Sequence, residues 1–299
     1  MTSPKVLVIT VTYNAMPWIG KFFESLKAST VPTDIIIIDN GSTDGTKEHI
    51  RQNYPEAHLV QSDSNLGFGK ANNVGLKYAI ENSYDYVYLL NQDAWIEKDC
   101  LGLLIDAHKR HSGYGILSPV QIQANGCHMD RNFLHTAAER TRGASLLNDI
   151  YFGNTAEIYD VDEVMAAHWL ISMECVRTVG GFSPAFYHYG EDYNYIDRAA
   201  YHGFKTGIVP KAIGIHDRED RPEPPDADIR RLNLSTLIKI NDITEEVSWA
   251  SIAARYVKMI FKARTLKHFR FLFKILFNSG KVKRYKEASK GRCAFLDIE

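Results

Sequence analysis

The sequence predicts an α/β protein built on a mixed, mostly parallel β-sheet with helices on both faces, followed by a helical and basic C-terminal region. Three features indicate this. Short apolar runs alternate with helical segments over residues 5–93, polar residues follow each apolar run, and residues 229–299 change to a helical, strongly basic pattern. Continuous apolar strands separated by helices are typical of a parallel sheet that is covered on both faces.

The elements of the N-terminal half follow in order. The apolar run Val6–Val11 predicts the first strand, and Asn40-Gly41-Ser42 is a turn and helix-capping signal after the second strand. The other expected strands are Asp34–Asp39, His58–Gln61 and Tyr84–Leu90, and the expected helices are Trp18–Leu26, Thr46–Gln52 and Gly69–Asn82. Ligands of such sheets bind at the carboxyl ends of the strands, where the polar residues gather. Each of those residues could also be only a turn residue.

Composition excludes several classes of protein. The chain has 299 residues, 45% of them hydrophobic and 24% charged, so it is not disordered, collagen-like or a coiled coil. Its cysteines form no C-x-x-C pair, which argues against a zinc site or disulfide scaffold and suits a reducing compartment. The first apolar run is too short for a signal peptide, and the longest one, Tyr86–Leu90, is too short to span a bilayer. We therefore expect a cytoplasmic protein.

A domain boundary is expected at the charged stretch 217–228. It holds three prolines, so it cannot pack as a helix or strand and is predicted to be an exposed loop. Residues 1–228 would form one domain, and residues 229–299 a separate helical region.

The helical region is strongly basic. Residues 229–299 carry 16 Lys and Arg against 6 Asp and Glu, a net charge of +10, whereas residues 1–228 carry −11. An apolar stripe recurs close to the helical period at Ile252, Tyr256, Met259 or Ile260, Ala263, Leu266, Phe269, Phe273 and Leu276. It either faces a protein core or lies on an anionic membrane surface, here the inner face of the cell membrane. A Phe-rich stripe contacts neither phosphates nor bases, so we expect no nucleic acid partner.

Three groups of titratable residues lie where they could take part in catalysis or bind a cation. Asp93 follows a buried strand, and a carboxylate there suits a hard divalent cation that shares its ligands with a diphosphate. Glu191 and Asp192 precede a helical pattern and are either helix-capping charges or a general base. His216 ends an apolar run, either as a surface residue or as a ligand of a metal or diphosphate.

The segment from Asn65 to Gly75 is rich in glycine. It lacks the third glycine of a dinucleotide fingerprint and the ending of a P-loop, which disfavours a nicotinamide oxidoreductase. Its glycines would let the backbone approach a ligand, and Lys70 could meet a phosphate.

In their order and spacing these segments resemble the family 2 glycosyltransferases over roughly Lys5–Asp217, and their motif style is most similar to the rhamnosyltransferase-like branch. The matching segments are Val11-Thr12-Tyr13-Asn14, Ile38-Asp39-Asn40-Gly41-Ser42-x-Asp44-Gly45-Thr46, Asn65-x-Gly67-Phe68-Gly69-x-x-Asn72-Asn73-x-Gly75, Leu90-Asn91-Gln92-Asp93, Val179-Gly180-Gly181-Phe182, Glu191-Asp192 with Arg198, and His216. The resemblance implies the GT-A nucleotide-diphosphosugar transferase fold, with a nucleotide-sugar half at about 1–112 and an acceptor half at about 113–217.

The resemblance also implies roles for individual residues. Asp192, with Glu191 beside it, would be the catalytic base, and Asp93 and His216 would hold Mg²⁺ or Mn²⁺. The nucleotide would be bound by Thr12, Tyr13, Asn14, Asp39, Asn40, Ser42, Asn65, Gly67, Lys70, Asn73, Asn91 and Gln92, and the acceptor by His168, Trp169 and Arg198.

The implied function is metal-dependent, inverting transfer of a hexosyl or deoxyhexosyl group from a nucleotide-diphosphate sugar to a glycan or lipid-linked glycan, in bacterial cell-surface polysaccharide assembly. Two positions depart from the family pattern: Asn91 replaces the first acid of an Asp-x-Asp pair, and Asn194 replaces an acid two residues after the base. They keep open the alternative of a catalytically silent nucleotide-sugar-binding subunit of a glycan-assembly complex.

Overall fold

The structure is a computed structural model that describes residues 3–139, 146–218, 226–246, 248–263 and 267–296. Its strands are β1 (Val6–Thr12), β2 (Asp34–Asp39), β3 (His58–Gln61), β4 (Tyr86–Leu90), β5 (Ala94–Ile96), β6 (Tyr114–Gln123), β7 (Tyr159–Asp160), β8 (His168–Ser172) and β9 (Lys205–His216). Its helices are α1 (Ile19–Ala28), α2 (Thr46–Asn53), α3 (Phe68–Glu81), α4 (Cys100–Arg110), α5 (Arg131–Glu139), α6 (Leu146–Phe152), α7 (Met173–Val179), α8 (Glu191–Tyr201), α9 (Ala227–Asn241), α10 (Trp249–Ala263), α11 (Lys267–Phe277) and α12 (Ser279–Ala288).

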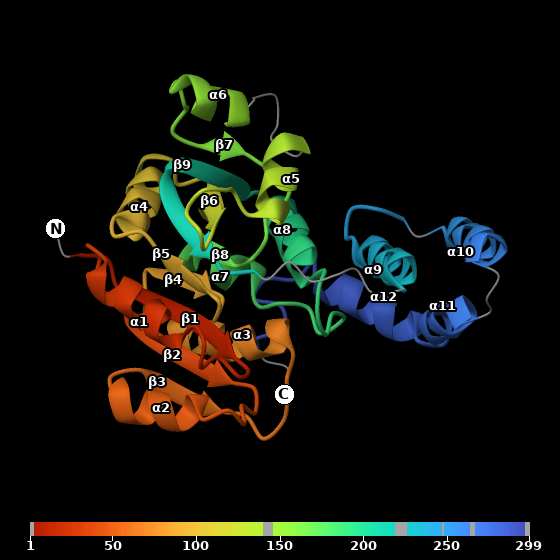
Figure 1. The fold of residues 1–299 in the computed structure, drawn as a ribbon. Coiled ribbons are helices and arrows are strands. Elements are labelled where there is room, and N and C mark those ends of the chain that lie inside the picture. Colours follow the sequence, from red (N-terminus) through yellow and green to blue (C-terminus); the bar gives the residue numbers. More distant parts are fainter. Residues whose placement is uncertain (1–2, 140–145, 219–225, 247, 264–266, 297–299) are drawn as a thin grey trace.

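One mixed sheet unites the described strands (Figure 1). Its order is β3-β2-β1-β4-β8-β6-β9-β5, and β7 pairs with β9. β3, β2, β1 and β4 are parallel neighbours, β8 runs antiparallel between β4 and β6, and β9 is parallel to β6. The carboxyl ends of β1, β2, β4 and β9 therefore lie at the same edge of the sheet, and the polar residues that follow these strands are brought together there.

Successive residues of the central strands face two different cores. Leu7 and Ile9 of β1 pack with residues of α3, α7 and α8, whereas Val6 and Val8 pack with residues of α1 and α4. Because both faces are covered, the central strands are apolar at most positions. Burying one such side chain contributes about 1.5–3 kcal/mol, so the two cores hold the sheet edge rigidly in place.

The expectations for residues 5–93 are confirmed. β2 and β3 have the predicted bounds, and the ends of β1, β4, α1, α2 and α3 differ from the prediction by one or two residues. The α/β class is confirmed as well. The sheet is mostly parallel, as predicted, because among the described strands only β5, β7 and β8 run against the direction of the others.

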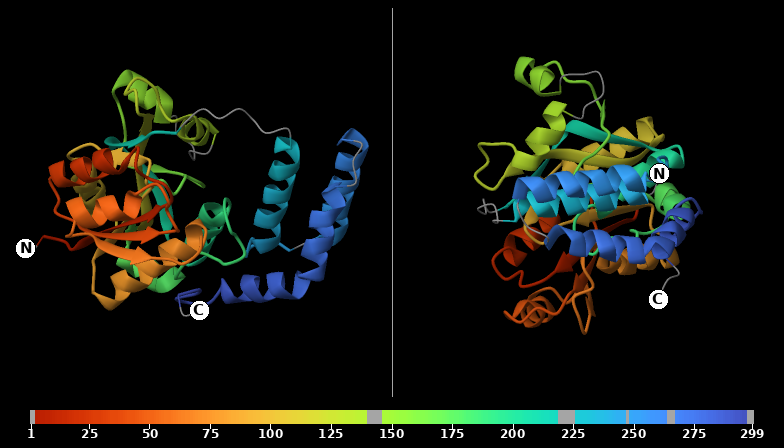
Figure 2. Two further views of the ribbon diagram at one scale, coloured as in Figure 1. Left: turned by 60° about the horizontal axis from the view of Figure 1, so that its bottom comes forward. Right: turned by 90° about the vertical axis from the view of Figure 1, so that its right-hand side faces the viewer.

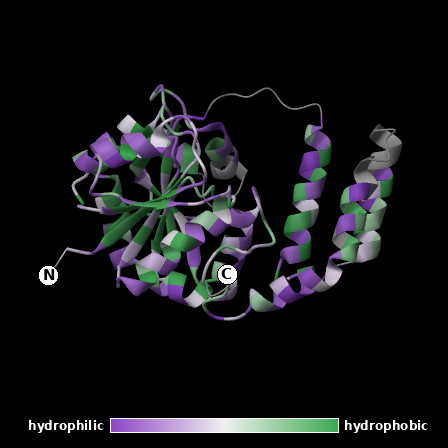
Figure 3. Ribbon diagram, turned by 90° about the horizontal axis from the view of Figure 1, so that it is seen from below, coloured by the Kyte–Doolittle hydropathy of each residue, from purple (hydrophilic) through white to green (hydrophobic). Residues whose placement is uncertain are grey.

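The basic region is helical, as predicted, but its apolar stripe does not form one continuous face. Ile252 and Tyr256 pack against α9 in a third core with Leu232, Ile240 and Leu272. Phe273 and Leu276 of the same stripe are 57% and 41% exposed. Leu266 lies outside the described residues, as do the side chains of Met259, Ile260, Ala263 and Phe269. Figure 3 shows hydrophobic and hydrophilic residues mixed around these helices. Among the described helices, none has the length and apolar character needed to cross a membrane.

After α12 the chain returns to the α/β domain (Figure 2). The Gly181 N–H donates to the Ala294 carbonyl at 2.7 Å, and the Cys293 N–H donates to the carbonyl of Thr178 at 2.9 Å. Phe295 is buried and lies 4.9 Å from the guanidinium carbon of Arg198. The sequence boundary at residue 228 does not anticipate this return, which anchors the far end of the helical region on α7 and α8.

Candidate active site

The turn after β2 is organised around Asp39, which is completely buried. The Thr12 hydroxyl donates to Asp39 Oδ2 at 2.9 Å, and the N–H groups of Gly41 and Ser42 donate to Oδ1 at 3.1 and 2.9 Å. The Ser42 hydroxyl also donates to Oδ2 and accepts from the N–H of Asn14. Thr12 and Ser42 are therefore both hydrogen-bonded to Asp39, and the three residues shape the turn at the sheet edge.

Tyr13 and Asn14 form the outer part of this edge. Gln92 clamps the Tyr13 backbone, since its Oε1 accepts from the Tyr13 N–H at 2.7 Å and its Nε2 donates to the carbonyl at 3.2 Å. Tyr13 itself is 52% exposed. Asn14 has φ +56°, a left-handed conformation that Asn tolerates better than most residues, and its Oδ1 accepts from the Thr43 N–H at 2.9 Å. An exposed aromatic ring thus lies beside a fixed polar turn.

Asn40 connects the turn to the glycine-rich loop. Its Nδ2 donates to the Gly67 carbonyl at 3.4 Å, and Asn65 Oδ1 accepts from the Gly67 N–H at 2.9 Å. Gly67 has φ +78°, and a Cβ at this position would lie 2.3 Å from the carbonyl oxygen of Tyr187, so only glycine fits. Lys70, in the first turn of α3, is exposed.

Asn73 of α3 is hydrogen-bonded to two distant segments of the chain. Its Oδ1 accepts from the Phe182 N–H at 2.6 Å, and its Nδ2 donates to the carbonyls of Phe182 at 2.9 Å and Phe295 at 3.3 Å. The side chain ties α3 to the loop before α8 and to the C-terminal segment. With both amide atoms bonded to the protein, Asn73 helps to fix this part of the fold, and its nucleotide contact stays a prediction.

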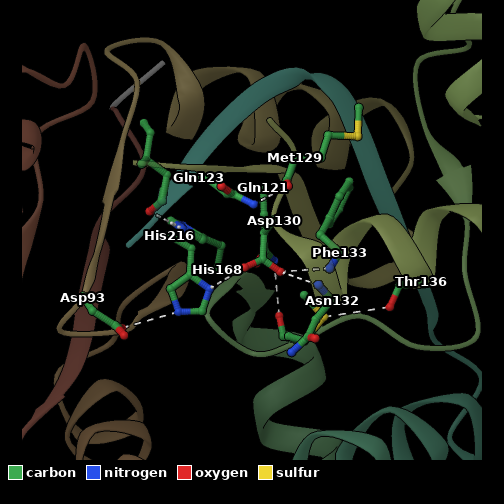
Figure 4. A network of polar contacts seen from close by, with 12 residues as sticks. Asp93, Gln121, Gln123, Met129, Asp130, Asn132, Phe133, Thr136, His168 and His216 are labelled. Carbon is green, nitrogen blue, oxygen red and sulfur yellow. Dashed lines mark hydrogen bonds and ion pairs between the residues drawn. The ribbon is translucent and has the colours of Figure 1, made fainter. Parts of the chain in front are cut away.

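Asp93, His216 and Asp130 form a row of polar groups at the ends of β4 and β9 (Figure 4). Asp93 Oδ1 lies 3.4 Å from His216 Nε2, and His216 Nδ1 lies 3.7 Å from Asp130 Oδ2. His216 and Asp130 are buried, while 27% of the Asp93 side chain is exposed. Burial alone would raise the pKa of Asp93, but the hydrogen bond and charge of His216, with the charge of Arg218, hold it below its ordinary value. Asn91 lies beside Asp93 and is half-buried.

The residues Asp93 and His216 fit part of a divalent cation site. Carboxylate oxygen and imidazole nitrogen both bind Mn²⁺, and Mg²⁺ is usually held by one or two carboxylates plus substrate phosphates. Within the described ranges, no three His, Cys, Asp or Glu residues are grouped so as to hold a metal ion by themselves. A cation at Asp93 and His216 would therefore complete its coordination with oxygens of a bound substrate.

A second cluster of carboxylates lies at the N-terminus of α8. Burial, with the charge of Asp192, raises the pKa of Glu191 to about 7, and burial, with the charge of Glu163, raises the pKa of Asp192 to about 6. Asp192, Glu163 and Thr136 line a cavity of about 10 Å³, which is room for about one water molecule. A hydroxyl group placed in this cavity would meet a carboxylate with a raised proton affinity.

Helix α5 connects the two clusters. Asp130 directly precedes α5, and Thr136 of α5 lines the Asp192 cavity (Figure 4). The two residues are six positions apart in the sequence, which corresponds to about 9 Å along a helix. Helix α5 therefore links the surroundings of the Asp93–His216 pair to the cavity at Asp192.

The predicted acceptor contacts of His168, Trp169 and Arg198 are wrong, because all three side chains are completely buried. His168 is hydrogen-bonded to the Tyr88 hydroxyl at 2.9 Å, and burial lowers its pKa to about 3. Trp169 is a core residue. Arg198 donates to main-chain carbonyls, including that of Gly181 at 2.5 Å, and so fixes the loop before α8.

Asp130 and Glu163 were not predicted from the sequence. Asp130 Oδ1 accepts from the N–H groups of Asn132 at 2.9 Å and Phe133 at 3.0 Å, so it caps α5 while Oδ2 faces His216. An aspartate just before a helical segment is a recognisable capping signal and could have indicated the start of α5. Glu163 lies between β7 and β8, where no sequence pattern distinguishes it.

Comparison with known proteins decides the family. The family model described as Glycosyl transferase family 2 matches residues 7–156, half of the chain. The chain belongs to glycosyl transferase family 2. This family member is 26% identical over 231 residues to an N-acetylglucosaminyl-diphospho-decaprenol L-rhamnosyltransferase of Mycobacterium tuberculosis, covering 71% of this chain and 75% of the relative. It is 36% identical over 96 residues to the O-antigen chain rhamnosyltransferase WbaN of Salmonella anatum, covering 31% and 30%.

Solved structures confirm the GT-A fold of this glycosyltransferase. TarS of S. aureus in complex with UDP matches with a TM-score of 0.55 and 19% identity, covering 86% of this chain and 72% of TarS. The mannosyltransferase PcManGT of Pyrobaculum calidifontis, in complex with GDP-Man and Mn²⁺, matches with a TM-score of 0.59 and 19% identity, covering 97% and 86%.

Proposed function

We propose that this family 2 glycosyltransferase moves a hexosyl or deoxyhexosyl group from a nucleotide-diphosphate sugar to a hydroxyl of a glycan or lipid-linked glycan, with inversion, in bacterial cell-surface polysaccharide assembly. The observation that carries the proposal is the half-buried Asp192 carboxylate, with a pKa raised to about 6, in a cavity lined by Thr136 of α5. Asp130, directly before α5, faces His216, which lies beside Asp93. The name of the Mycobacterium tuberculosis relative, an N-acetylglucosaminyl-diphospho-decaprenol L-rhamnosyltransferase, supports a lipid-linked acceptor.

The nucleotide would bind over the ends of β1 and β2. The exposed Tyr13 ring offers a surface on which a base could stack. Asn14 and Asn40 would meet the base and ribose, on a turn that Asp39 holds rigid. The loop from Asn65 to Gly67 and the exposed Lys70 would approach the diphosphate, because glycine allows close backbone contact and an ammonium group attracts phosphate. Thr12, Ser42 and Gln92 would act through the turn and strand ends that they fix.

The diphosphate would lie against Asp93 and His216, with Asn91 nearby. A Mg²⁺ or Mn²⁺ ion held there would neutralise the negative charge that develops on the leaving diphosphate. Asp130 would keep the His216 ring in place from the buried side, since Asp130 Oδ2 lies 3.7 Å from His216 Nδ1.

Asp192 would act as the general base. It would accept the proton of the acceptor hydroxyl as the oxygen attacks the anomeric carbon on the face opposite the departing diphosphate. One displacement of this kind inverts the anomeric centre. Glu191, with a pKa of about 7, would be about half protonated at pH 7 and would serve a supporting role beside Asp192.

The second candidate function is a catalytically silent nucleotide-sugar-binding subunit of a glycan-assembly complex. Asn194 favours it, because Asn194 Nδ2 donates to the Asn241 carbonyl at 3.3 Å and so links α8 to α9 in place of an acid that would support the base. Asn91 favours it too, since an amide binds a cation more weakly than a carboxylate does.

The helical region would bind the inner face of the cell membrane as a peripheral contact of a cytoplasmic enzyme. Phe273, Leu276 and Phe277 of α11 are 57%, 41% and 89% exposed, and Ser251–Lys290 has 12 basic residues against one acid. Apolar side chains beside Lys and Arg are the pattern of a helix at an anionic membrane surface.

The proposal is tested in two steps. Thermal shifts with UDP, dTDP and GDP in the presence of Mn²⁺ identify the nucleotide, since a ligand at 100 times its Kd stabilises by about 2.7 kcal/mol. Release of the nucleoside diphosphate from the matching nucleotide sugar is then measured. Turnover that requires an acceptor supports the enzyme, and binding without turnover of any donor sugar supports the silent subunit.

A further inference from the structure

A groove of about 340 Å³ lies between α9, α10 and α12. Its apolar wall is formed by Ile240 of α9, Trp249 of α10 and Val282 of α12, and the side chains of Lys283 and Lys286 line it as well. This volume falls in the lower part of the range of small-molecule sites, which are mostly apolar with a few polar groups. The groove shares no lining residue with the cavity at Asp192.

One face of α12 supplies the basic side of the groove. Ser279, Val282, Lys283 and Lys286 follow the spacing i, i+3, i+4 and i+7, which places them on the same side of a helix. Arg284 is exposed and does not line the groove. Gly280 does line it, and a Cβ added there would meet no atom within 4 Å.

The charge of the groove is positive. Lys286 Nζ donates to the main-chain carbonyl of Glu245, which holds the ammonium group over the connection from α9 to α10. The Glu245 carboxylate lies 3.8 Å from Lys239 Nζ, and no acidic residue is among those that line the groove. Two ammonium groups beside an apolar wall are complementary to an amphiphile with an anionic head.

The groove is joined to the helix that carries Asp192. Ile240 is followed by Asn241, whose carbonyl accepts from Asn194 of α8. Leu234 of α9 lies against Gly190, where an added Cβ would be 2.9 Å from Leu234 Cδ1. Helix α9 therefore contacts the first half of α8 with one part of its surface and lines the groove with Ile240.

We propose that this groove binds the lipid end of the acceptor, a single isoprenoid-type chain that carries a phosphate or diphosphate. The inference rests on the proposed transfer to a lipid-linked glycan. The apolar wall would take the first isoprene units, and Lys283 and Lys286 would meet the diphosphate, which as a dianion or trianion attracts both. The exposed Phe277, two residues before Ser279, would enter the bilayer beside the groove. The headgroup of a bulk phospholipid could bind exposed basic residues such as Arg284 and would not require the apolar wall of the groove.

Binding is tested directly with farnesyl diphosphate, which is soluble and carries both an isoprenoid chain and a diphosphate. Calorimetry on the 299-residue protein should show binding whose affinity falls at least tenfold in Lys283→Glu and in Gly280→Leu, which adds a side chain to the groove wall. Arg284→Glu is the matched control, because it makes the same charge change on the adjacent, non-lining residue, and its affinity should stay within twofold. Farnesol and inorganic diphosphate should each bind at least tenfold more weakly. Equal losses in Lys283→Glu and Arg284→Glu, or full displacement by phosphatidylglycerol vesicles, would overturn the proposal.

A turnover assay separates this inference from the proposed function. With a prenyl-diphosphate-linked sugar as acceptor, Lys283→Glu should raise the acceptor KM at least tenfold, while donor hydrolysis by water is unchanged. Transfer with an unaltered acceptor KM would refute the groove and leave the glycosyltransferase activity standing. Farnesyl diphosphate binding that depends on Lys283, in a protein that turns over no donor, would retain the groove and refute the activity.

Discussion

Replacing Asp192 with asparagine separates catalysis from stability, because the structure predicts opposite effects on the two. The carboxylate lines a cavity of about 10 Å³, and a positioned general base contributes about 10²–10⁴-fold to a rate. Asp192→Asn should therefore lower turnover by at least about 10²-fold with donor binding intact. Wild-type turnover should rise with pH through about 6, since only the ionised form of Asp192 accepts a proton.

The same substitution should stabilise the fold. Burial raises the pKa of Asp192 from 3.8 to about 6, so the folded protein binds more protons than the unfolded chain between these values. The contribution of Asp192 to the free energy of unfolding is fully present below its ordinary pKa and is lost as the pH rises through about 6. The difference corresponds to about 3 kcal/mol at pH 7. Asparagine carries no charge and can keep the hydrogen bond from the Tyr193 N–H, so the variant should recover up to that amount.

Urea unfolding at pH 5 and pH 8, together with nucleoside diphosphate release, measures both effects. The matched control is Asp197→Asn on the same helix, where burial, with the charge of Asp242, raises the pKa to about 7. That variant should also gain stability but keep its turnover within a few-fold. Glu191→Gln should be milder than Asp192→Asn. Turnover of Asp192→Asn close to that of the parent would refute the assignment, and a larger loss in Glu191→Gln would move the base to Glu191.

Three further predictions concern the cation, the C-terminal return and the membrane. Asp93→Ala should abolish the metal-dependent part of nucleoside diphosphate binding, and Asn91→Ala should weaken it less; calorimetry that gives the same affinity with and without EDTA would show that no cation bridges the diphosphate. Phe295→Ala should lower the free energy of unfolding by about 3–5 kcal/mol in denaturant unfolding, because the ring is buried against Arg198. Phe277→Ala should change the free energy of unfolding by less than about 0.5 kcal/mol, because that ring is exposed, and equal effects of the two variants would contradict the packing. Phe273→Ser with Phe277→Ser should reduce co-sedimentation with anionic vesicles, which salt should also weaken, whereas binding that is indifferent to both changes would exclude α11 as the contact.

The parallel half of the sheet could be predicted from the sequence because its signals are local. In β1 and β2 both faces are covered, so each strand is one apolar run, and Asn40-Gly41-Ser42 marks the turn between strand and helix. Strands β6 and β8 gave no such signal, and of β9 only the apolar run that ends at His216 was recognised. β6 contains a proline and pairs with β9 through two register shifts, and β8 is a short strand inserted between strands distant in the sequence.

The candidate site could be predicted only where a residue follows a strand end. Asp93 and His216 were found in this way, and the topology brings them within 3.4 Å of each other. His168 and Arg198 mislead, because a polar residue in a motif can bind the protein's own backbone, and only the packing of β8 and α8 shows that these two do. The return of Cys293–Leu296 to α7 depends on contacts more than a hundred positions apart in the sequence, which no local pattern records.

The central claim, sugar transfer by a single displacement with Asp192 as base, is tested most directly by the anomeric configuration of the product. Proton NMR of the reaction with the donor that the thermal shifts select would follow the anomeric signals of donor and product in one sample. The account predicts a glycosidic product with the configuration opposite to that of the donor, formed by the parent protein and at least about 10²-fold more slowly by Asp192→Asn. A product that retains the donor configuration would contradict it.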